Sequence, residues 1–314
     1  MSQNLMQHRQ KIADVIVARM EDAIEWKKPW ITAVVAPYNE ISKKKYRGSN
    51  NLYLSVLAWE KGYQDPRWMT FKQLKDKGYH LQAGSKGAEI GYYRVYDKVK
   101  KRDLDFDWWN TLTLEQQANY RENIQFVFRS SVVFNGSCID GLEPFKAPAR
   151  NNDIKMQKSI SYIADNMGVG IYSDGGSRAF YRSATDDIHL PESSCFWDQA
   201  MYDATMLHEL AHATGHPTRL NRDMSGFFGS PEYAKEELRA EISSFFVSQE
   251  LGCPITTEVT DNHIAYLQNW INAIKSDNSI LFEVIKESDT IADYMISKSY
   301  EISAVQYDED DLEL

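Results

Sequence analysis

Two histidines four residues apart, with a glutamate beside the first, form the part of the chain best suited to chemistry. The run is His208-Glu209-Leu210-Ala211-His212. On a helix this spacing places both imidazoles on one face, where they can chelate one metal ion. Zinc suits such ligands, and a catalytic zinc site keeps one position for water. Glu209 could accept a proton from that water as it attacks a carbonyl, and pass it to the leaving amine. The motif predicts a metallopeptidase-like zinc site.

A catalytic zinc site needs a third protein ligand. A histidine six residues after His212 would complete one known arrangement, but Thr218 occupies that position. Glu237 and Glu241 lie four apart in a segment followed by apolar residues, so a helix would place both carboxylates on one face. We expect Glu237 to bind the metal and Glu241 to hydrogen-bond a ligand imidazole. The reverse assignment is the alternative, and a solvated helix face is the non-functional one.

Several other side chains near this motif are candidates for contacts with a substrate. His216 lies one further helical turn along, although a local structural role is the commoner one for such a histidine. Tyr181 is a candidate donor to a developing oxyanion, as are Tyr202 and Tyr233. The segment 187–191 precedes the motif and could be an edge strand that binds an extended peptide, or a core strand without a ligand.

The N-terminal half interleaves cations with aromatic rings. Single-stranded nucleic acid binding uses this combination, because cations track phosphates and rings stack on bases. The alternative is that many of these rings belong to the core. The candidate DNA contacts are Lys43, Lys44, Lys45, Tyr46, Arg47, Arg67, Trp68, Lys72 and Lys86.

Hydrophobic periodicity and capping signals predict the elements that position these residues. Asn50 or Asn51 is expected to cap a helix that runs to about Glu60, and Thr70 to Gln73 fits a capping box. Gly215 is a candidate helix C-cap after the second histidine. The segment 97–123 is expected to be an insertion. Other predicted helices cover 3–26, 153–167, 197–214, 232–250, 261–276 and 279–297. Predicted strands cover 79–82, 88–96, 124–134, 168–172, 179–182 and 187–190.

Charge divides the chain into two halves. Residues 1–150 carry 24 Lys and Arg against 17 Asp and Glu, a net charge of +7, whereas residues 151–314 carry 11 against 28, a net charge of -17. This predicts two domains, 1–143 and 151–300, with a linker at 144–150 and an acidic tail at 301–314. No apolar run is long enough to span a bilayer, and three scattered cysteines do not suggest a disulfide framework. We therefore expect a cytoplasmic protein that does not contact membranes.

In its order of motifs the chain resembles the ArdC-type antirestriction proteins of plasmids and other mobile elements, over roughly residues 5–298. The N-terminal marks include Tyr46-Arg47-Gly48-Ser49-Asn50, Pro66-Arg67-Trp68-Met69-Thr70 and Gly84-Ser85-Lys86-Gly87. The C-terminal marks include Asp187-Ile188-His189-Leu190-Pro191, the His208 motif with Thr214-Gly215-His216, and Glu236-Glu237-Leu238-Arg239-Ala240-Glu241. The segment 97–123 matches no motif of the family, and Gly136-Ser137-Cys138 departs from its usual pattern.

The resemblance implies an α+β protein. Its N-terminal mixed α/β domain would bind single-stranded DNA, and its mainly helical C-terminal domain, with a small sheet, would be a zincin-like metallopeptidase. It also implies protection of incoming DNA from restriction, with a protein of the host restriction system as a further candidate partner. Proteolysis and DNA shielding both fit, as does a peptidase whose N-terminal domain binds protein. The same ligands accept manganese, cobalt or nickel as well as zinc.

Overall fold

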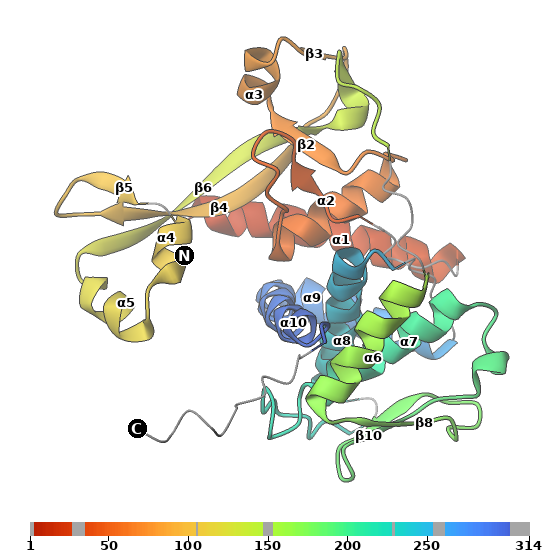
Figure 1. Cartoon of the computed structure of the whole chain (residues 1–314). Helices are drawn as coiled ribbons and strands as arrows, with labels where there is room; N and C mark the ends of the chain where they lie inside the picture. Colours follow the sequence, from red (N-terminus) through yellow and green to blue (C-terminus); the bar gives the residue numbers. More distant parts are fainter. Residues whose placement is uncertain are drawn as a thin grey trace, which may run out of the picture. The chain divides into compact units, whose positions relative to one another are not determined.

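Two compact units make up the chain in the computed structural model (Figure 1). The structure describes residues 3–26, 35–104, 106–146, 153–227, 230–253 and 261–301. The first unit comprises Met1–Arg19 and Ala36–Lys146, and the second comprises Met20–Val35 and Ala147–Leu314. The break after Lys146 falls within the segment predicted as a linker, most of which lies outside the described residues. The predicted acidic tail also lies outside them beyond Glu301.

Helix α1 (Gln3–Trp26) contributes residues to both units. Its Ile12, Ile16 and Met20 recur every four residues and are buried, so one apolar stripe continues across the division. In the first unit, the His8 ring lies 5.3 Å from that of Phe128. Gly91 makes room for this contact, because a Cβ at that position would lie 2.7 Å from His8 Nε2.

A five-stranded sheet forms the framework of the first unit, in the order β1-β2-β6-β4-β5. Strand β1 is parallel to β2, and the other neighbours are antiparallel. The long strands β4 and β6 pair from Ala88 opposite Val133 to Asp97 opposite Ile124. The strands are β1 (Tyr38–Asn39), β2 (Arg67–Thr70), β4 (Ala88–Asp97), β5 (Arg102–Leu104) and β6 (Ile124–Asn135).

The segment 97–123 covers the far end of the β4–β6 pair, where Figure 1 shows it in yellow. It folds into β5, α4 (Phe106–Thr111) and α5 (Leu114–Tyr120), and Thr113 forms a capping box at the start of α5. Trp109 packs with Val95 and Ile124, and all three side chains are buried. The insertion therefore has a small core of its own, built on the sheet face that carries Val95.

Helix α2 (Gly48–Glu60) starts earlier than predicted, and neither Asn50 nor Asn51 caps it. Arg47 is the N-cap residue and makes no side-chain capping bond. Asn50 Nδ2 instead donates to the Gly91 carbonyl at 2.7 Å, and Asn50 Oδ1 accepts from the Gly91 N–H at 3.1 Å. Strand β5 pairs only with residues 95–97 of β4, so the backbone of Gly91 needs this other partner.

Helix α3 (Phe71–Asp76) begins at the predicted capping box, since the Thr70 side chain accepts from the Gln73 N–H and Gln73 bonds the Thr70 backbone. A two-stranded sheet of β3 (His80–Leu81) and β7 (Ile139–Asp140) follows it. Leu74 of α3, Met69 of β2 and Ile139 of β7 form one buried cluster. This cluster closes the first unit at the end away from the insertion.

The second unit is mainly helical, with α6 (Asp153–Met167), α7 (Gln199–Ala213), α8 (Pro231–Leu251), α9 (Asp261–Ser276) and α10 (Ser279–Ser297). Helix α8 packs against α7, α9 and α10. Its small sheet has the order β8-β10-β9, with β8 (Gly170–Tyr172), β9 (Phe180–Arg182) and β10 (Asp187–His189). The predicted α+β class is confirmed. No described helix combines the length and apolar character that a membrane span requires.

Candidate metal centre and nucleic-acid interface

Helix α7 carries the two histidines and is anchored at both ends. Asp198 caps its start by accepting a hydrogen bond from the Met201 N–H at 2.9 Å. Leu207, Leu210 and Ala211 are fully buried on the side that packs into the unit. His208 and His212 therefore project together from the remaining face, one turn apart.

Helix α8 supplies the carboxylates that face them. Ser230 caps it, with Pro231 in its first turn, a position where proline costs no hydrogen bond. Leu238, Ile242 and Phe245 are buried and fix the rotation of the helix. That rotation brings Glu237 and Glu241 toward α7.

The ligand atoms of His208, His212 and Glu237 all lie within 4.8 Å of one another. The two Nε2 atoms are 3.2 Å apart; His208 Nε2 lies 3.5 Å from Glu237 Oε2, and His212 Nε2 lies 3.5 Å from Glu237 Oε1. Tetrahedral ligands at about 2.0–2.1 Å from a zinc ion lie about 3.3 Å from one another. The two imidazole nitrogens therefore match this separation, and Glu237 turns one carboxylate oxygen toward each of them.

Each imidazole also faces a carboxylate through its other nitrogen. His208 Nδ1 lies 3.5 Å from Glu241, the residue expected from the sequence to take this part. His212 Nδ1 lies 3.3 Å from Glu236, which the sequence reasoning missed. Such partners fix the tautomer and the ring orientation of a ligand histidine. Glu236 adjoins Glu237 in the sequence, but no spacing rule links it to His212, 24 residues away.

Two arginines hold Glu236 in place. Arg222 donates to Glu236 Oε1 at 2.7 Å, and Arg239 lies 3.3 Å from Oε2. Arg222 also donates to Thr214 Oγ1 at 2.5 Å and to the Ala211 carbonyl at 3.0 Å, both at the end of α7. A charged network therefore ties the histidine helix to the carboxylate helix.

The position of Arg222 depends on Gly215. The predicted C-cap role is wrong, because Thr214 is the C-cap and Gly215 does not adopt a left-handed conformation. A Cβ at Gly215 would instead lie 2.2 Å from Met224 Sδ and 3.1 Å from Arg222 Nη2. The glycine lets the loop that carries Arg222 approach the end of α7.

The carboxylates shift the titration of both histidines. Burial lowers the pKa of His212, but hydrogen bonds with Glu236 and Glu237 outweigh it and raise the pKa to about 9. Burial likewise opposes a raised pKa at His208, yet Glu237 and Glu241 hold that pKa well above its ordinary value. Burial raises the pKa of Glu236, but His212 and Arg222 more than compensate and lower it to about 2. The cluster is thus built around positive charge, which a divalent cation would supply in place of the protons.

Glu209 stands next to His208 on α7 and is only 7% exposed. Among the described residues its carboxylate has no hydrogen-bond partner. A buried acid beside a metal-ligand set, with its oxygens unengaged by the protein, is suited to receive a proton from water.

Tyr181 and His216 are occupied by a different network. The Tyr181 hydroxyl donates to Asp186 Oδ1 at 2.8 Å and accepts from Arg219 at 3.3 Å. His216 Nδ1 bonds Thr218 Oγ1 at 2.8 Å and lies 3.8 Å from Asp186 Oδ2. Burial and Asp186 raise the pKa of Tyr181. A substrate would have to displace Asp186 to use the Tyr181 proton, so these contacts stay predictions.

The segment 187–191 does not provide a sheet edge. Strand β10 lies between β8, to which it is parallel, and β9, to which it is antiparallel. Ile188 and Leu190 are fully buried. The edge-strand alternative is wrong and the core-strand alternative holds, because both backbone edges of β10 are already paired.

Most of the candidate DNA contacts in the first unit are exposed. Lys43 pairs with Glu40 at 2.6 Å, and Tyr46 is half-buried with its hydroxyl 3.4 Å from Asn39 Nδ2. Asn39 Nδ2 also donates to Gln73 at 3.0 Å, which ties this loop to helix α3. The exposed cations are Lys43, Lys44, Lys45, Arg47, Lys72 and Lys86.

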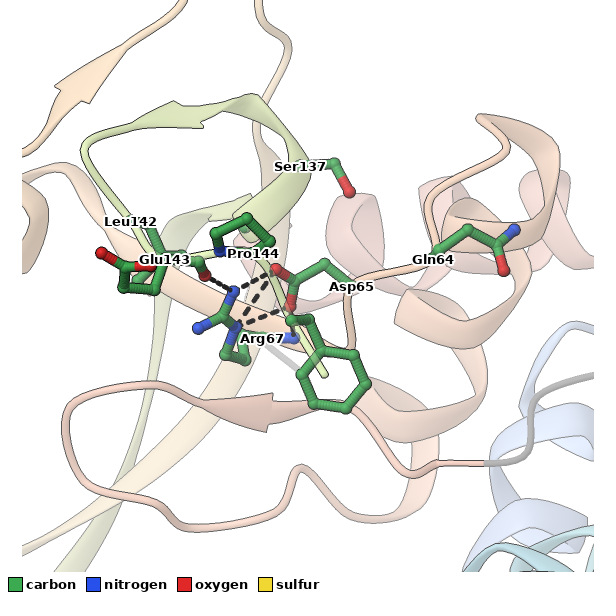
Figure 2. Close-up of a pocket in the computed structure, with 9 residues that line it drawn as sticks. Gln64, Asp65, Arg67, Ser137, Leu142, Glu143 and Pro144 are labelled. Carbon is green, nitrogen blue, oxygen red and sulfur yellow. Dashed lines mark hydrogen bonds and ion pairs between the residues drawn. The ribbon is translucent and has the colours of Figure 1, made fainter. Parts of the chain in front are cut away.

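The structure corrects the prediction that Arg67 and Trp68 contact DNA, because both have structural roles. Trp68 is 2% exposed, so no base can stack on it. Arg67 is buried and donates to both oxygens of Asp65 and to the Glu143 carbonyl, as Figure 2 shows. These groups line a pocket of about 220 Å³. Both residues come from β2, an inner strand of the sheet, which explains why their side chains are covered.

Comparisons with known proteins bear on both units. Residues 6–134 match the family model described as the N-terminal domain of anti-restriction factor ArdC, and residues 158–287 match that of a zincin-like metallopeptidase. The chain belongs to the ArdC-type antirestriction family. The family resemblance that the motifs suggested is therefore confirmed.

Solved and curated relatives agree with this assignment. Two crystal structures of the antirestriction ArdC protein from plasmid R388, one metal-free and one Mn(II)-bound, are 28% identical to the chain with a TM-score of 0.66. They cover 93% and 94% of this chain and 97% and 99% of that protein. The protein y4eC of Sinorhizobium fredii is 30% identical over 91% of this chain and 90% of its own length. Two Escherichia coli DNA primases TraC are 36% and 34% identical, but the chain spans only 18% and 27% of their length.

Proposed function

We propose that this antirestriction-family protein belongs to a mobile element, works in the cytoplasm, binds single-stranded DNA through its first unit and hydrolyses peptide bonds at a zinc site in its second. His208, His212 and Glu237 would hold the metal, with Glu241 and Glu236 orienting the two imidazoles. The clustering of the three side chains carries this proposal, because the two imidazole nitrogens are 3.2 Å apart, as tetrahedral zinc ligands are, and each has an oxygen of Glu237 at 3.5 Å. A protein of the host restriction system is the proposed substrate.

Glu209 has the central part in the proposed chemistry. A bound zinc ion would polarise a carbonyl and lower the pKa of water. The Glu209 carboxylate would accept the proton of the attacking water and deliver it to the leaving amine. Because Glu209 is buried next to His208, it can do so without competition from bulk solvent.

The metal is tested first, by measuring metal content and affinity after dialysis against a chelator. Zinc is the expected ion because imidazole and carboxylate ligands at these spacings suit it, and manganese is the competitor that the R388 relative suggests. Cobalt and nickel complete the titration series. We expect one ion per chain and its loss in His208→Ala and Glu237→Ala. If Glu237→Ala still binds the metal, and binding is lost only when Glu241 is replaced as well, then Glu241 is the ligand and the two glutamate roles are reversed.

Catalysis is tested with Glu209→Gln, using labelled casein and extracts that contain restriction enzymes as substrates. The variant should keep its metal and lose metal-dependent cleavage, because the amide cannot accept a proton. Metal-dependent cleavage that survives this substitution would refute the mechanism. If the wild-type protein cleaves nothing and Glu209→Gln still protects DNA, the site is structural and protection comes from DNA occupancy.

The DNA activity rests on the exposed cations of the first unit and on its net charge. Affinity for single strands should fall steeply with salt, because each neutralised phosphate releases counterions. A stable complex with a protein and none with oligonucleotides would instead make the first unit a protein-binding domain.

A further inference from the structure

One face of the β4–β6 pair turns to solvent beyond Ile90, where most of its residues are polar or aromatic. Register places Tyr92, Arg94 and Tyr96 of β4 on the same face as Arg129 and Val127 of β6. The opposite face carries Gly91, Phe128 and Val95, which contact α1 or the insertion. The Tyr92 side is buried at Ala88, Ile90 and Val133, so only its stretch beyond Ile90 is open. We call this stretch the Tyr92 face and define it by Tyr92, Arg94, Tyr96, Val127 and Arg129.

Tyr92 differs from the other exposed aromatic residues of these strands. Tyr92 is 44% exposed, close to Tyr93 at 41% and Phe126 at 46%. Tyr93 lies edge-on to Phe128, and Phe126 lies edge-on to Trp109, so both of these rings already pack against another ring on the opposite face. Within the described residues, the Tyr92 ring contacts no other ring and its hydroxyl has no hydrogen-bond partner. Its flat surface is available to a ligand.

Arg129 lies directly opposite Tyr92 in the register and is exposed. Side chains at such opposed positions have Cβ atoms about 4.5–5.5 Å apart. Arg94, on the same face, pairs with Asp103 of β5. Arg129 has no ion-pair partner among the residues the structure describes. An aromatic ring with an uncompensated cation beside it is the arrangement that stacks a base and holds its phosphate.

Helix α2, which follows the basic loop, contacts β4 beside Tyr92. Asn50, in the first turn of α2, bonds both backbone groups of Gly91, the residue that precedes Tyr92. Lys43, Lys44, Lys45 and Arg47 lead into that turn and are exposed. The cations of the loop can thus continue a phosphate track that begins at Arg129.

We propose that the Tyr92 face, not the buried Trp68, is the base-stacking platform for single-stranded DNA, with Arg129 as its phosphate contact. This inference rests on the proposed DNA binding and gives it a place on the molecule. Stacking on one ring is tolerant of base identity, so little sequence preference is expected. Duplex DNA should bind less well, because its bases are not free to stack.

The test compares variants of the full chain by fluorescence anisotropy with a labelled oligo-dT strand over a range of salt concentrations. Tyr92→Leu should weaken binding about tenfold without changing the salt dependence, and Tyr92→Phe should bind like the wild type. Arg129→Gln should reduce the slope of log affinity against log salt by about 0.7, the value for one contact to a single strand.

Two matched controls test whether the loss of any exposed ring or cation weakens DNA binding. Tyr93→Leu removes a similarly exposed ring from the opposite face of the strands, and Arg121→Gln removes an exposed cation at the end of α5. Both should bind like the wild type, and circular dichroism and melting curves exclude variants that do not fold.

The outcomes distinguish this inference from the proposed function. Unchanged binding in Tyr92→Leu and Arg129→Gln, with loss in a Lys43, Lys44 and Lys45 triple variant, would overturn the Tyr92 face but keep DNA binding. No binding by the wild type would remove both. A poly-glutamate peptide could also compete with the oligonucleotide as well as unlabelled DNA does. If that competition is weakened by Arg129→Gln but not by Tyr92→Leu, the face is a site for acidic peptides and the proposal is overturned.

Discussion

Glu236 offers the sharpest test of how the metal centre is held together. Its carboxylate lies between His212 Nδ1, at 3.3 Å, and the guanidinium of Arg222, at 2.7 Å. The change Glu236→Gln keeps the shape of the side chain and removes its charge. The amide oxygen can then accept from the imidazole or from the arginine, but with less energy in either case.

The expected loss follows from what Glu236 touches. Removing a partner of a ligand histidine lowers metal affinity by about 10–100-fold, which corresponds to about 1.4–2.7 kcal/mol. The same change leaves Arg222 and Arg239 buried with less compensating charge. Breaking a buried ion pair costs up to about 3–5 kcal/mol of folding free energy, and the retained hydrogen bond should hold the loss below that range.

Competition with a chromophoric chelator measures the metal affinity, and urea unfolding of the metal-free protein measures the stability. Glu232→Gln is the matched control, since Glu232 is exposed in the first turn of α8. Glu241→Gln should cost less than Glu236→Gln, because its oxygen lies 3.5 Å from His208 and its side chain is more exposed. If Glu236→Gln matches Glu232→Gln in metal affinity, the network does not support the metal centre.

The remaining predictions concern protons, packing and the corrected DNA contacts. Metal binding at pH 7.5 should release protons, seen as buffer-dependent heats in calorimetry, because the pKa of His212 is raised to about 9 and that of His208 is also raised in the metal-free protein. The raised pKa values of both histidines also stabilise the metal-free fold below about pH 6.5, and for His212 this contribution disappears as the pH rises through about 9. The free energy of unfolding of the metal-free protein, measured by chemical unfolding, should therefore decline over this range, and bound metal should abolish the decline. Gly215→Ala should destabilise the second unit by about 1–3 kcal/mol in urea unfolding, and Met224→Ala in the same chain should recover part of the loss, since Met224 Sδ is the nearest atom; an unchanged midpoint would contradict the close approach. Trp68→Ala should cost about 3–5 kcal/mol while the folded protein keeps its DNA affinity, and the opposite pattern would restore Trp68 as a contact.

Local patterns predicted much of the second unit. The helices 153–167, 261–276 and 279–297 have the bounds expected from the sequence, because hydrophobic period and caps are properties of neighbouring residues. The histidine spacing on α7 is equally local. The partner of His212 was not predictable in this way, since Glu236 is 24 residues away and its choice depends on how α8 is rotated against α7. The prediction that Asn50 caps α2 was wrong for a similar reason, because the unpaired backbone of Gly91 binds the side chain that would otherwise form the cap.

The insertion shows how a segment without a recognisable motif can still shape a functional surface. Strands β4 and β6 extend past the core of the first unit, and a two-stranded ribbon is marginally stable alone. Trp109 and its neighbours cover Val95 and Ile124, so the apolar residues of the extension are buried on one side only. The other side is then free to carry polar and aromatic residues such as Tyr92 and Arg129. Deleting 101–122 should therefore weaken DNA binding indirectly, by loosening the strands that hold the Tyr92 face, although none of the proposed contacts lies within the deleted segment.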